Sequence, residues 1–498
     1  MSTGDAYLGQ IVTTITGASF WSRGNNAIVI TFDEGDDSGG AGGGRVLTVV
    51  VTSHGPRAIQ DGATYSHYSL LRTLQDNFGV PCLAGSCSAA TMSPLFAITG
   101  SAARHVQPLA QRNWPTPTPT PSEPQTYTTN TPSAGGWSVI GSPMLGTNDN
   151  SLGAVAASSA GDVWAVGNFV PDTAGSNQDA TISLAAHFDG SAWKAVPTPN
   201  AGPNFNTFFG VAANSGKAWA VGVHLDSNFK ARALIEAWDG AKWTIASNPQ
   251  PGAEKDILFA ASATSPSDAW AVGEQQGANA RFGGLVEHFD GSAWSAVNVP
   301  NPGDAGNSLY GVKAVGPDDV WVVGQALTSS GSDTALVEHW DGKTWSVVPT
   351  PTTGGFAAAL YTIAGSNDGG LVAVGEVDSF TGGSRPLVER YGGGGWKVAH
   401  LPSGAGSQFS ALWSVATNGD STWAAGTQFD STGGIMRTLV LHGTEDGWSV
   451  VQASDPGAPS QNDSVLGGVV VAGETWWIVG HYKDDTGRKT LIERHTED

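Results

Sequence analysis

From residue 137 onward, short apolar runs and polar turns alternate along the chain with a fixed period. Seven tryptophans mark this period, and consecutive members are 56, 50, 51, 51, 51 and 52 residues apart. They are Trp137, Trp193, Trp243, Trp294, Trp345, Trp396 and Trp448. A unit of about 50 residues that recurs several times is typical of repeat architectures, in which each unit buries its apolar faces against its neighbours.

Each unit contains the pattern of four short β-strands. In one unit these runs are Leu309–Val315, Val320–Gly324, Ala335–Trp340 and Trp345–Val348. The pair Asp341-Gly342 stands between the last two runs, where Asp-Gly predicts a tight hairpin turn. Comparable pairs occur at Asp189-Gly190, Asp239-Gly240 and Asp290-Gly291. Four antiparallel strands in each of seven units predict an all-β, seven-bladed β-propeller over residues 136–498.

The two ends of the repeat region are incomplete in complementary ways. The strand after Trp137 arrives without the three strands that precede it in other units, and the last unit stops after "TLIERH" without an outer strand. Pairing these ends in one blade would close the ring and leave no open sheet edge. The unit resembles kelch-type propellers in its period, its glycine after an apolar strand and its trailing tryptophan, but "WAVG" has one glycine where the kelch pattern has two.

Aromatic and histidine side chains in the repeats have two interpretations. Six tryptophans share one position of the unit, which favours packing between blades over stacking on sugars. They are Trp164, Trp219, Trp270, Trp321, Trp423 and Trp477. His187, His288 and His339 recur before an Asp-Gly turn, where we expect a hydrogen bond to a neighbouring loop and no metal. The repeats thus identify no ligand site, and a surface glycan or a protein is the expected partner class.

The first 112 residues have a different pattern, which predicts an α/β fold. A helix over Asp5–Thr16 is followed by the apolar run "NAIVITFDEGDD", a second apolar run "RVLTVVVTS" and a helix over "SHYSLLRTLQDNFG". Asp33 and Glu34 follow the first run, at the carboxyl end of the predicted strand, where ligands bind in open α/β sheets. Adjacent carboxylates suit a divalent cation. Residues 113–135 alternate proline with threonine and predict an extended linker.

Charge and composition exclude several classes of function. The 498 residues hold 23 Lys and Arg against 44 Asp and Glu, a net charge of -21, which disfavours nucleic acid as a partner. No apolar run is long enough for a transmembrane helix, and the first residues lack a signal-peptide pattern. Cys82 and Cys87 are compatible with either a disulfide or two thiols. A Thr/Pro linker suits a secreted protein, so we expect an extracellular location.

Residues 4–98 resemble the C-terminal portion of the phosphoesterase family of bacterial phospholipases C and acid phosphatases, in the alkaline phosphatase-like superfamily. The segments that match are "GDAYLGQIV", "AIVITFDEGDD", "RVLTVVVTSHGP", "YSHYSLLRTLQDNFGVP" and "SPLF". The resemblance implies a divalent-metal-dependent hydrolase of phosphomonoesters or phospholipids. It assigns Asp33 and Glu34 as metal ligands and places His54 and His67 beside the site. For His67, capping or packing is the alternative interpretation.

The family's nucleophile and first metal ligands, near an "ENxSFD"-like motif, have no counterpart in this chain. We therefore expect the chain by itself to be inactive as a hydrolase. Two hypotheses follow from the sequence. One is a phosphoesterase truncated before its nucleophile, with a propeller appended for binding or targeting. The other is a non-catalytic propeller that recognises a surface glycan or a protein.

Overall fold

The computed structural model describes most of the chain from Gly136 to Thr496. Within that range it leaves out 147–148, 172–180, 203–204, 279–280, 352, 356, 366–369, 380–382, 407–408, 431–434, 445, 455, 457–463 and 485–486. Before Gly136 it describes residues 12, 16, 27–31, 48–52, 69–73 and 89–92. The chain divides into two compact units, Met1–Pro121 and Ser122–Asp498.

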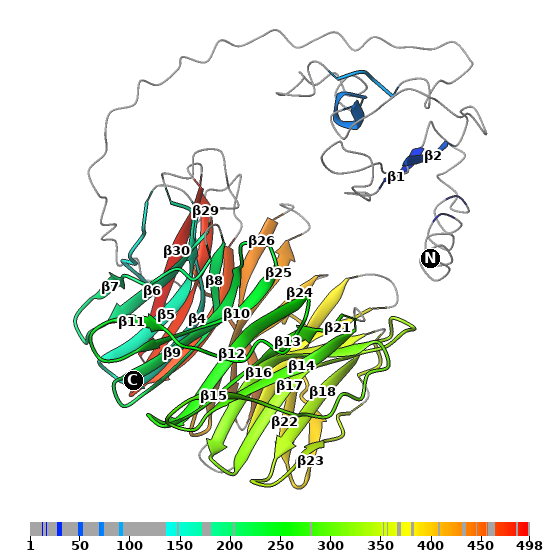
Figure 1. Cartoon of the computed structure of the whole chain (residues 1–498). Helices are drawn as coiled ribbons and strands as arrows, with labels where there is room; N and C mark the ends of the chain where they lie inside the picture. Colours follow the sequence, from blue (N-terminus) through cyan, green and yellow to red (C-terminus); the bar gives the residue numbers. More distant parts are fainter. Residues whose placement is uncertain are drawn as a thin grey trace, which may run out of the picture. The chain divides into compact units, whose positions relative to one another are not determined.

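The second unit contains seven four-stranded antiparallel sheets, which confirms the prediction of a seven-bladed β-propeller (Figure 1). Blade 1 consists of β4 (Asn150–Ser159), β5 (Asp162–Phe169), β6 (Ile182–Phe188) and β7 (Trp193–Val196). Blade 2 consists of β8 (Asn206–Asn214), β9 (Lys217–Leu225), β10 (Ala231–Trp238) and β11 (Trp243–Ile245). Blade 3 consists of β12 (Lys255–Ser265), β13 (Asp268–Gln276), β14 (Phe282–Phe289) and β15 (Trp294–Val297).

Blade 4 consists of β16 (Gly306–Gly316), β17 (Asp319–Leu327), β18 (Thr334–Trp340) and β19 (Trp345–Val347). Blade 5 consists of β20 (Ala358–Gly365), β21 (Leu371–Asp378), β22 (Ser384–Gly392) and β23 (Gly395–Val398). Blade 6 consists of β24 (Ser410–Asn418), β25 (Ser421–Asp430), β26 (Ile435–Thr444) and β27 (Gly447–Val451). The first strands of consecutive blades contact one another around the whole ring, so these strands form its inner wall.

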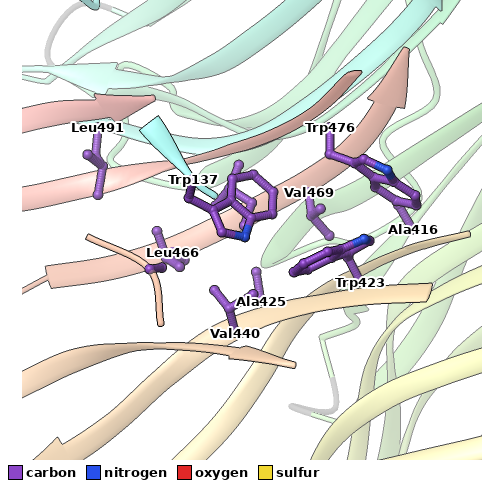
Figure 2. Packing of buried hydrophobic residues seen from close by; sticks show 11 residues of the cluster. Trp137, Ala416, Trp423, Ala425, Val440, Leu466, Val469, Trp476 and Leu491 are labelled. Atoms are coloured by element: carbon purple, nitrogen blue, oxygen red, sulfur yellow. The ribbon is translucent and has the colours of Figure 1, made fainter. Parts of the chain in front are cut away.

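Blade 7 combines the two ends of the repeat region. It consists of β28 (Ser464–Ala472), β29 (Thr475–Asp484), β30 (Gly487–Thr496) and, as its outer strand, β3 (Ser138–Ile140). Trp137, which precedes β3, is fully buried and meets the Trp423 ring of blade 6 edge-on at a centroid distance of 5.2 Å. Figure 2 shows Trp137 between Leu466, Trp476 and Trp423. The closing strand is therefore held by packing between blades as well as by its ladder.

Apolar layers between neighbouring blades hold the ring together. The six tryptophans that share one position of the unit are 1 to 6 % exposed, which confirms that they pack in the core. In blade 5, Val372 takes this position and is also buried. The Asp-Gly pairs join the third and fourth strands of blades 1 to 4, as their sequence predicts. At each turn the aspartate carboxylate accepts backbone N–H groups two and three residues on, as in Asp239 with Ala241 (2.8 Å) and Lys242 (2.9 Å).

The prediction of an N-terminal α/β fragment is wrong. In the described part of the first unit, β1 (Ala27–Thr31) and β2 (Thr48–Thr52) form an antiparallel pair, and helical backbone is confined to residues 12, 16 and 69–73. Antiparallel pairing sets the carboxyl end of β1 beside the start of β2, so this pair is not part of a parallel ladder of the kind that builds an open α/β sheet. Val49 is 42 % exposed, whereas strands of a parallel sheet are covered on both faces.

Candidate functional site at the inner wall of the propeller

The site residues that the sequence predicts lie outside the described residues. These are Asp33, Glu34, His54 and His67, and the same holds for Cys82 and Cys87. The divalent metal at Asp33 and Glu34 thus stays a prediction. Within the part of the chain that the structure describes, there is no group of three or more His, Cys, Asp or Glu side chains that could hold a metal ion.

The recurrent histidines of the propeller belong to packed Asp-His-Trp sets. The Nε2 atoms of His187, His288 and His339 lie 2.7, 2.7 and 2.8 Å from carboxylates of Asp162, Asp268 and Asp319. The expected hydrogen bond is present, but its partner begins the second strand of the same blade and is not in a loop. Each imidazole also stacks on the buried tryptophan of its blade, at centroid distances of 4.1 to 4.2 Å.

These sets lack the order of a catalytic triad. The hydroxyl of Ser158 donates to Asp162, and that of Thr264 donates to Asp268. The aspartate therefore stands between the hydroxyl and the imidazole, whereas activation of a nucleophile requires the imidazole to contact the hydroxyl. We interpret the sets as structural.

A β-bulge at one position of every inner strand shapes the inner wall of the ring. In each blade the register of the first and second strands shifts by one residue, for example between Phe208 and Gly210 in blade 2. The glycine of the "WAVG" motif lies opposite the residue before the bulge. A Cβ on Gly222 would lie 1.9 Å from the carbonyl oxygen of Thr207, and the equivalent glycines are as crowded. The glycine is thus required by the bulge.

The extra residue of the bulge is aromatic in five consecutive blades. These residues are Phe209, Phe259, Tyr310, Tyr361 and Trp413, which we call the aromatic arc. Each ring contacts the next, with centroid distances of 5.8, 5.5, 5.4 and 4.7 Å in chain order. Phe209 is 38 % exposed and the other four are partly exposed. Because these residues stand on the innermost strands, the arc follows the inner wall of the ring through blades 2 to 6.

Two glycines complete the circle of bulge positions. Gly153 in blade 1 and Gly467 in blade 7 take the place of an aromatic residue, and we call this part of the wall the glycine gap. The two inner strands are neighbours, because a Cβ on Gly467 would lie 2.7 Å from the carbonyl oxygen of Gly153. A Cβ on Gly153 itself would meet nothing closer than 4.0 Å. The wall therefore has an aromatic side and an open side.

Polar side chains next to the "WAVG" glycines make hydrogen bonds to the inner wall. The Tyr361 hydroxyl donates to Glu376 at 2.5 Å, and the Trp413 indole Nε1 donates to Thr427 at 3.0 Å. The Ser308 hydroxyl donates to Glu274 at 2.7 Å. These contacts orient the rings and place oxygen atoms beside them, an arrangement typical of small-molecule sites.

A polar corner lies beside the glycine gap and consists of Ser151, Asn168 and His481. The Ser151 hydroxyl lies 2.9 Å from Nδ1 of His481 across the boundary between blades 1 and 7. Asn168 stands directly opposite Ser151 in the ladder of β4 and β5. All three residues are partly exposed. Their side chains can donate and accept hydrogen bonds without carrying a formal charge when the imidazole is neutral.

The charge at the aromatic arc is weakly acidic. The Glu274 carboxylate pairs with Lys255 at 2.6 Å. Burial, followed by the hydrogen bond to Glu376, raises the pKa of Tyr361 far above its ordinary value, so its hydroxyl keeps its proton and remains a donor. Burial, followed by the charges of Glu376 and Asp333, raises the pKa of Asp378. An anionic ligand would meet this field unfavourably.

A second set of titratable groups lies between the blades. Glu236, Glu287, Glu338, Glu389 and Glu493 share one position on the third strand and are fully buried. Burial raises the pKa of Glu236, Glu287 and Glu338 to about 8 and that of Glu389 to about 7. Because they are inaccessible, we assign them no role in binding.

The backbone explains why most of these carboxyl groups are isolated. The N–H of Ser454 donates to Glu493 at 3.2 Å from the connection after blade 6. The same position after blades 1 to 5 holds proline, which has no N–H to donate; these residues are Pro199, Pro249, Pro300, Pro351 and Pro402. Among the described residues, neither carboxyl oxygen of Glu236, Glu338 or Glu389 has a hydrogen-bond partner.

An open cavity of about 490 Å³ lies on blade 4, between its outer strands and the segment before β16. Its titratable lining residue is Asp304, whose carboxylate accepts the backbone and side-chain hydrogen bonds of Ser329. These bonds hold the pKa of Asp304 below its usual value. The cavity therefore offers no acid or base suited to catalysis, and the inner wall is the stronger candidate site.

The aromatic arc is absent from the sequence-based assignment because its position varies in residue type. The signal that could have identified it is the residue before the small-residue-plus-apolar pair in "TFFGV", "ILFAA", "SLYGV", "ALYTI" and "ALWSV". In a regular strand this residue would be assigned to one face by alternation. Only the bulge makes it an unpaired residue of the inner wall.

Comparisons with known proteins identify no family for this chain. No protein-family model and no curated protein matches the chain. The resemblance of residues 4–98 to the phosphoesterase family therefore has no support. No helix among the described residues is long and apolar enough to cross a membrane.

Three of the solved structures that are similar to this chain differ in what they bind. YCF48 bound to a D1 peptide is 15 % identical, with 73 % of this chain and 96 % of that chain covered at a TM-score of 0.45. An ulvan lyase, bound to a saccharide, is 10 % identical, with 73 % and 94 % covered at a TM-score of 0.44. The six-bladed propeller lectin of Aleuria aurantia is 12 % identical, with 60 % and 95 % covered at a TM-score of 0.39. Because these scores are below 0.5, the assignment as a seven-bladed β-propeller rests on the seven sheets themselves.

Proposed function

We propose that the propeller is a non-catalytic binding module whose ligand lies on the aromatic arc. The observation that carries this proposal is the contact chain of five partly exposed aromatic rings on five neighbouring inner strands. The tryptophans between the blades are buried, which shows that the fold can cover aromatic side chains where stability requires it. Exposed aromatic area with polar groups at its edge is typical of a ligand-binding surface.

The absence of chemical machinery at the arc favours binding over catalysis. Two carboxylates beside the rings are already engaged, Glu274 by Lys255 and Ser308, and Glu376 by Tyr361. Catalysis requires an acid or base in reach of the reacting atoms with a suitable pKa. The groups with strongly shifted carboxyl pKa values, such as Glu338, are buried between blades.

The test uses the full-length chain on a mixed array of oligosaccharides and peptides. The double variant Tyr310→Ala, Trp413→Ala removes the two arc positions on either side of Tyr361. Ile245→Ala is the matched control because Ile245 is an exposed apolar residue on the outer strand β11. We expect array ligands that bind the wild type and the control but lose at least tenfold in signal with the double variant. Circular dichroism checks that all three proteins are folded. If every bound ligand is retained by the double variant, the arc is not the binding site.

A further inference from the structure

We propose that the ligand of the aromatic arc is an uncharged oligosaccharide whose sugar rings lie on the aromatic faces and whose hydroxyl groups reach the polar corner of Ser151, Asn168 and His481. This inference rests on the proposed function and specifies the class of its ligand. It is carried by the combination of an aromatic side, an open glycine gap and neutral hydrogen-bonding groups beside that gap.

The arc is suited to a chain of sugar rings. The C–H bonds on one face of a pyranose carry a small positive charge and are attracted to the negative face of an aromatic ring. Four successive centroid distances of 4.7 to 5.8 Å make the arc longer than a single sugar ring. Tyr310, Tyr361 and Trp413 add polar atoms at the edges of their rings. An oligosaccharide therefore uses the whole surface, whereas a monosaccharide uses one part of it.

The inner wall is less suited to an extended peptide. A peptide that adds to a sheet needs unpaired backbone groups along a strand edge. Several such groups on the inner strands are already bonded to the neighbouring blade. The Trp413 carbonyl accepts from Thr362 and the Gly365 carbonyl accepts from Thr417, both at 2.6 Å, while the N–H of Val469 donates to Ser414 at 3.0 Å.

The charges favour a ligand without net charge. The chain carries a net charge of -21, and the Glu376 carboxylate lies beside the arc, so uronic or sulfated sugars would be repelled. The Glu274 carboxylate is paired with Lys255 and the Glu376 carboxylate accepts the Tyr361 hydroxyl, so both are already engaged where a cationic sugar would need a carboxylate. The polar corner offers a hydroxyl, an amide and an imidazole, which match the alternating donors and acceptors of sugar hydroxyls.

The glycine gap provides the position for the ligand's polar edge. Gly153 has negative or extended backbone geometry and open space around its missing side chain, so a larger residue can be introduced there without backbone strain. Gly467 is unsuitable for this purpose because its Cβ would meet the backbone of blade 1. Gly153→Leu therefore fills the gap while leaving the arc intact.

The experiment is calorimetric titration of the full-length chain with the neutral sugars cellohexaose, maltohexaose and N-acetylchitohexaose. Hexagalacturonate is the anionic probe, and a fully deacetylated chitosan hexamer is the cationic probe. We expect at least one neutral hexasaccharide to bind, hexagalacturonate to bind at least tenfold more weakly, and Gly153→Leu and Trp413→Ala each to weaken the neutral sugar at least tenfold. Asn168→Ala should weaken it about 3- to 10-fold through one lost hydrogen bond. Ile245→Ala should bind as the wild type does.

Each other outcome overturns the inference. Arc-dependent binding of peptides, hexagalacturonate or a fully deacetylated chitosan hexamer, without arc-dependent binding of a neutral sugar, leaves the proposed function standing and rejects the ligand class. Neutral sugar binding that survives both Trp413→Ala and Gly153→Leu places the sugar elsewhere. No binding of any neutral hexasaccharide also rejects the inference. Binding by a variant is interpreted only when its melting temperature stays within a few degrees of the wild type. Trp413→Ala and Gly153→Leu lie on different blades, so that one misfolded variant does not decide the result.

Discussion

Two repeated positions of the propeller behave in opposite ways. At the position between blades, six units carry tryptophan and the seventh carries Val372, and all seven residues are buried. At the bulge of the inner strand, the seven units carry two phenylalanines, two tyrosines, a tryptophan and two adjacent glycines. The first position serves the same packing need in every blade, whereas the second differs from blade to blade and remains partly exposed. Uniformity in this repeat protein thus marks stability, and variation at a fixed position marks the candidate site.

The largest effect that tests this comparison is expected at the position between blades. Trp270→Ala removes a buried ring from the apolar layer between blades 3 and 4. The same ring is the stacking partner of His288. A buried aromatic residue replaced by alanine costs about 3–5 kcal/mol of the free energy of unfolding. Denaturant unfolding followed by fluorescence measures this loss, with Ile245→Ala as the control. A cost below about 1 kcal/mol would show that the two positions do not differ as we describe.

The next effect is a dependence of stability on pH. Burial raises the pKa of Glu338 from 4.5 to about 8, so between these values the unfolded chain releases a proton that the folded chain keeps. The contribution of Glu338 to stability must therefore fall as pH rises from about 4.5 to about 8, with a slope of at most about 1.4 kcal/mol per pH unit. Below pH 4.5 the group is protonated in both states and contributes no slope.

Glu338→Leu isolates this contribution, because blade 6 has Leu441 at the same position. We expect the variant to melt at a higher temperature than the wild type at pH 8 and to differ from it little at pH 4.5. Glu474→Leu, which changes an exposed glutamate, is the control. Equal melting temperatures of Glu338→Leu and the wild type at both pH values would mean that the Glu338 carboxyl is solvated in the folded protein.

The smallest effect on stability is expected at the arc itself. Phe209 is 38 % exposed, and the ring contacts that it loses in Phe209→Ala are those with Phe259. We expect a cost of about 1 kcal/mol or less, because the ring already keeps much of its surface in water. The matched substitution in the same blade is Trp219→Ala, which removes a residue that is 3 % exposed. If both variants lose equal stability in denaturant unfolding, the arc is a packing feature and not a binding surface.

The sequence predicts those parts of the molecule that depend on contacts between neighbouring strands. Tryptophan spacing and the Asp-Gly turns identify the blades, because each hairpin is local and each unit repeats the same burial. The α/β prediction failed because an apolar run of five residues is compatible with a parallel or an antiparallel strand, and pairing of β1 with β2 decides between them.

The candidate site depends on a feature that no single strand encodes. Alternation along β16 assigns Tyr310 to a face of the sheet, but the register shift between Leu309 and Gly311 leaves it unpaired. Its contacts with Phe259 and Tyr361 then link residues about 50 positions apart in the chain. The buried Glu338 was likewise missed, since its environment comes from the adjacent blade.

Closure of the ring by β3 has a mechanical consequence. The chain before Gly136 leads directly into this strand, whose ladder with β30 has only three residue pairs, from Ser138 with Arg494 to Ile140 with Ile492. Tension on the chain from its N-terminal side is therefore applied first to the weakest ladder of blade 7 and to the seat of Trp137. Tension at the other end acts on β30, which is held between β29 and β3 by ladders on both sides. The propeller should thus open under a smaller force when tension is applied through the chain before Gly136 than when it is applied at the C-terminus.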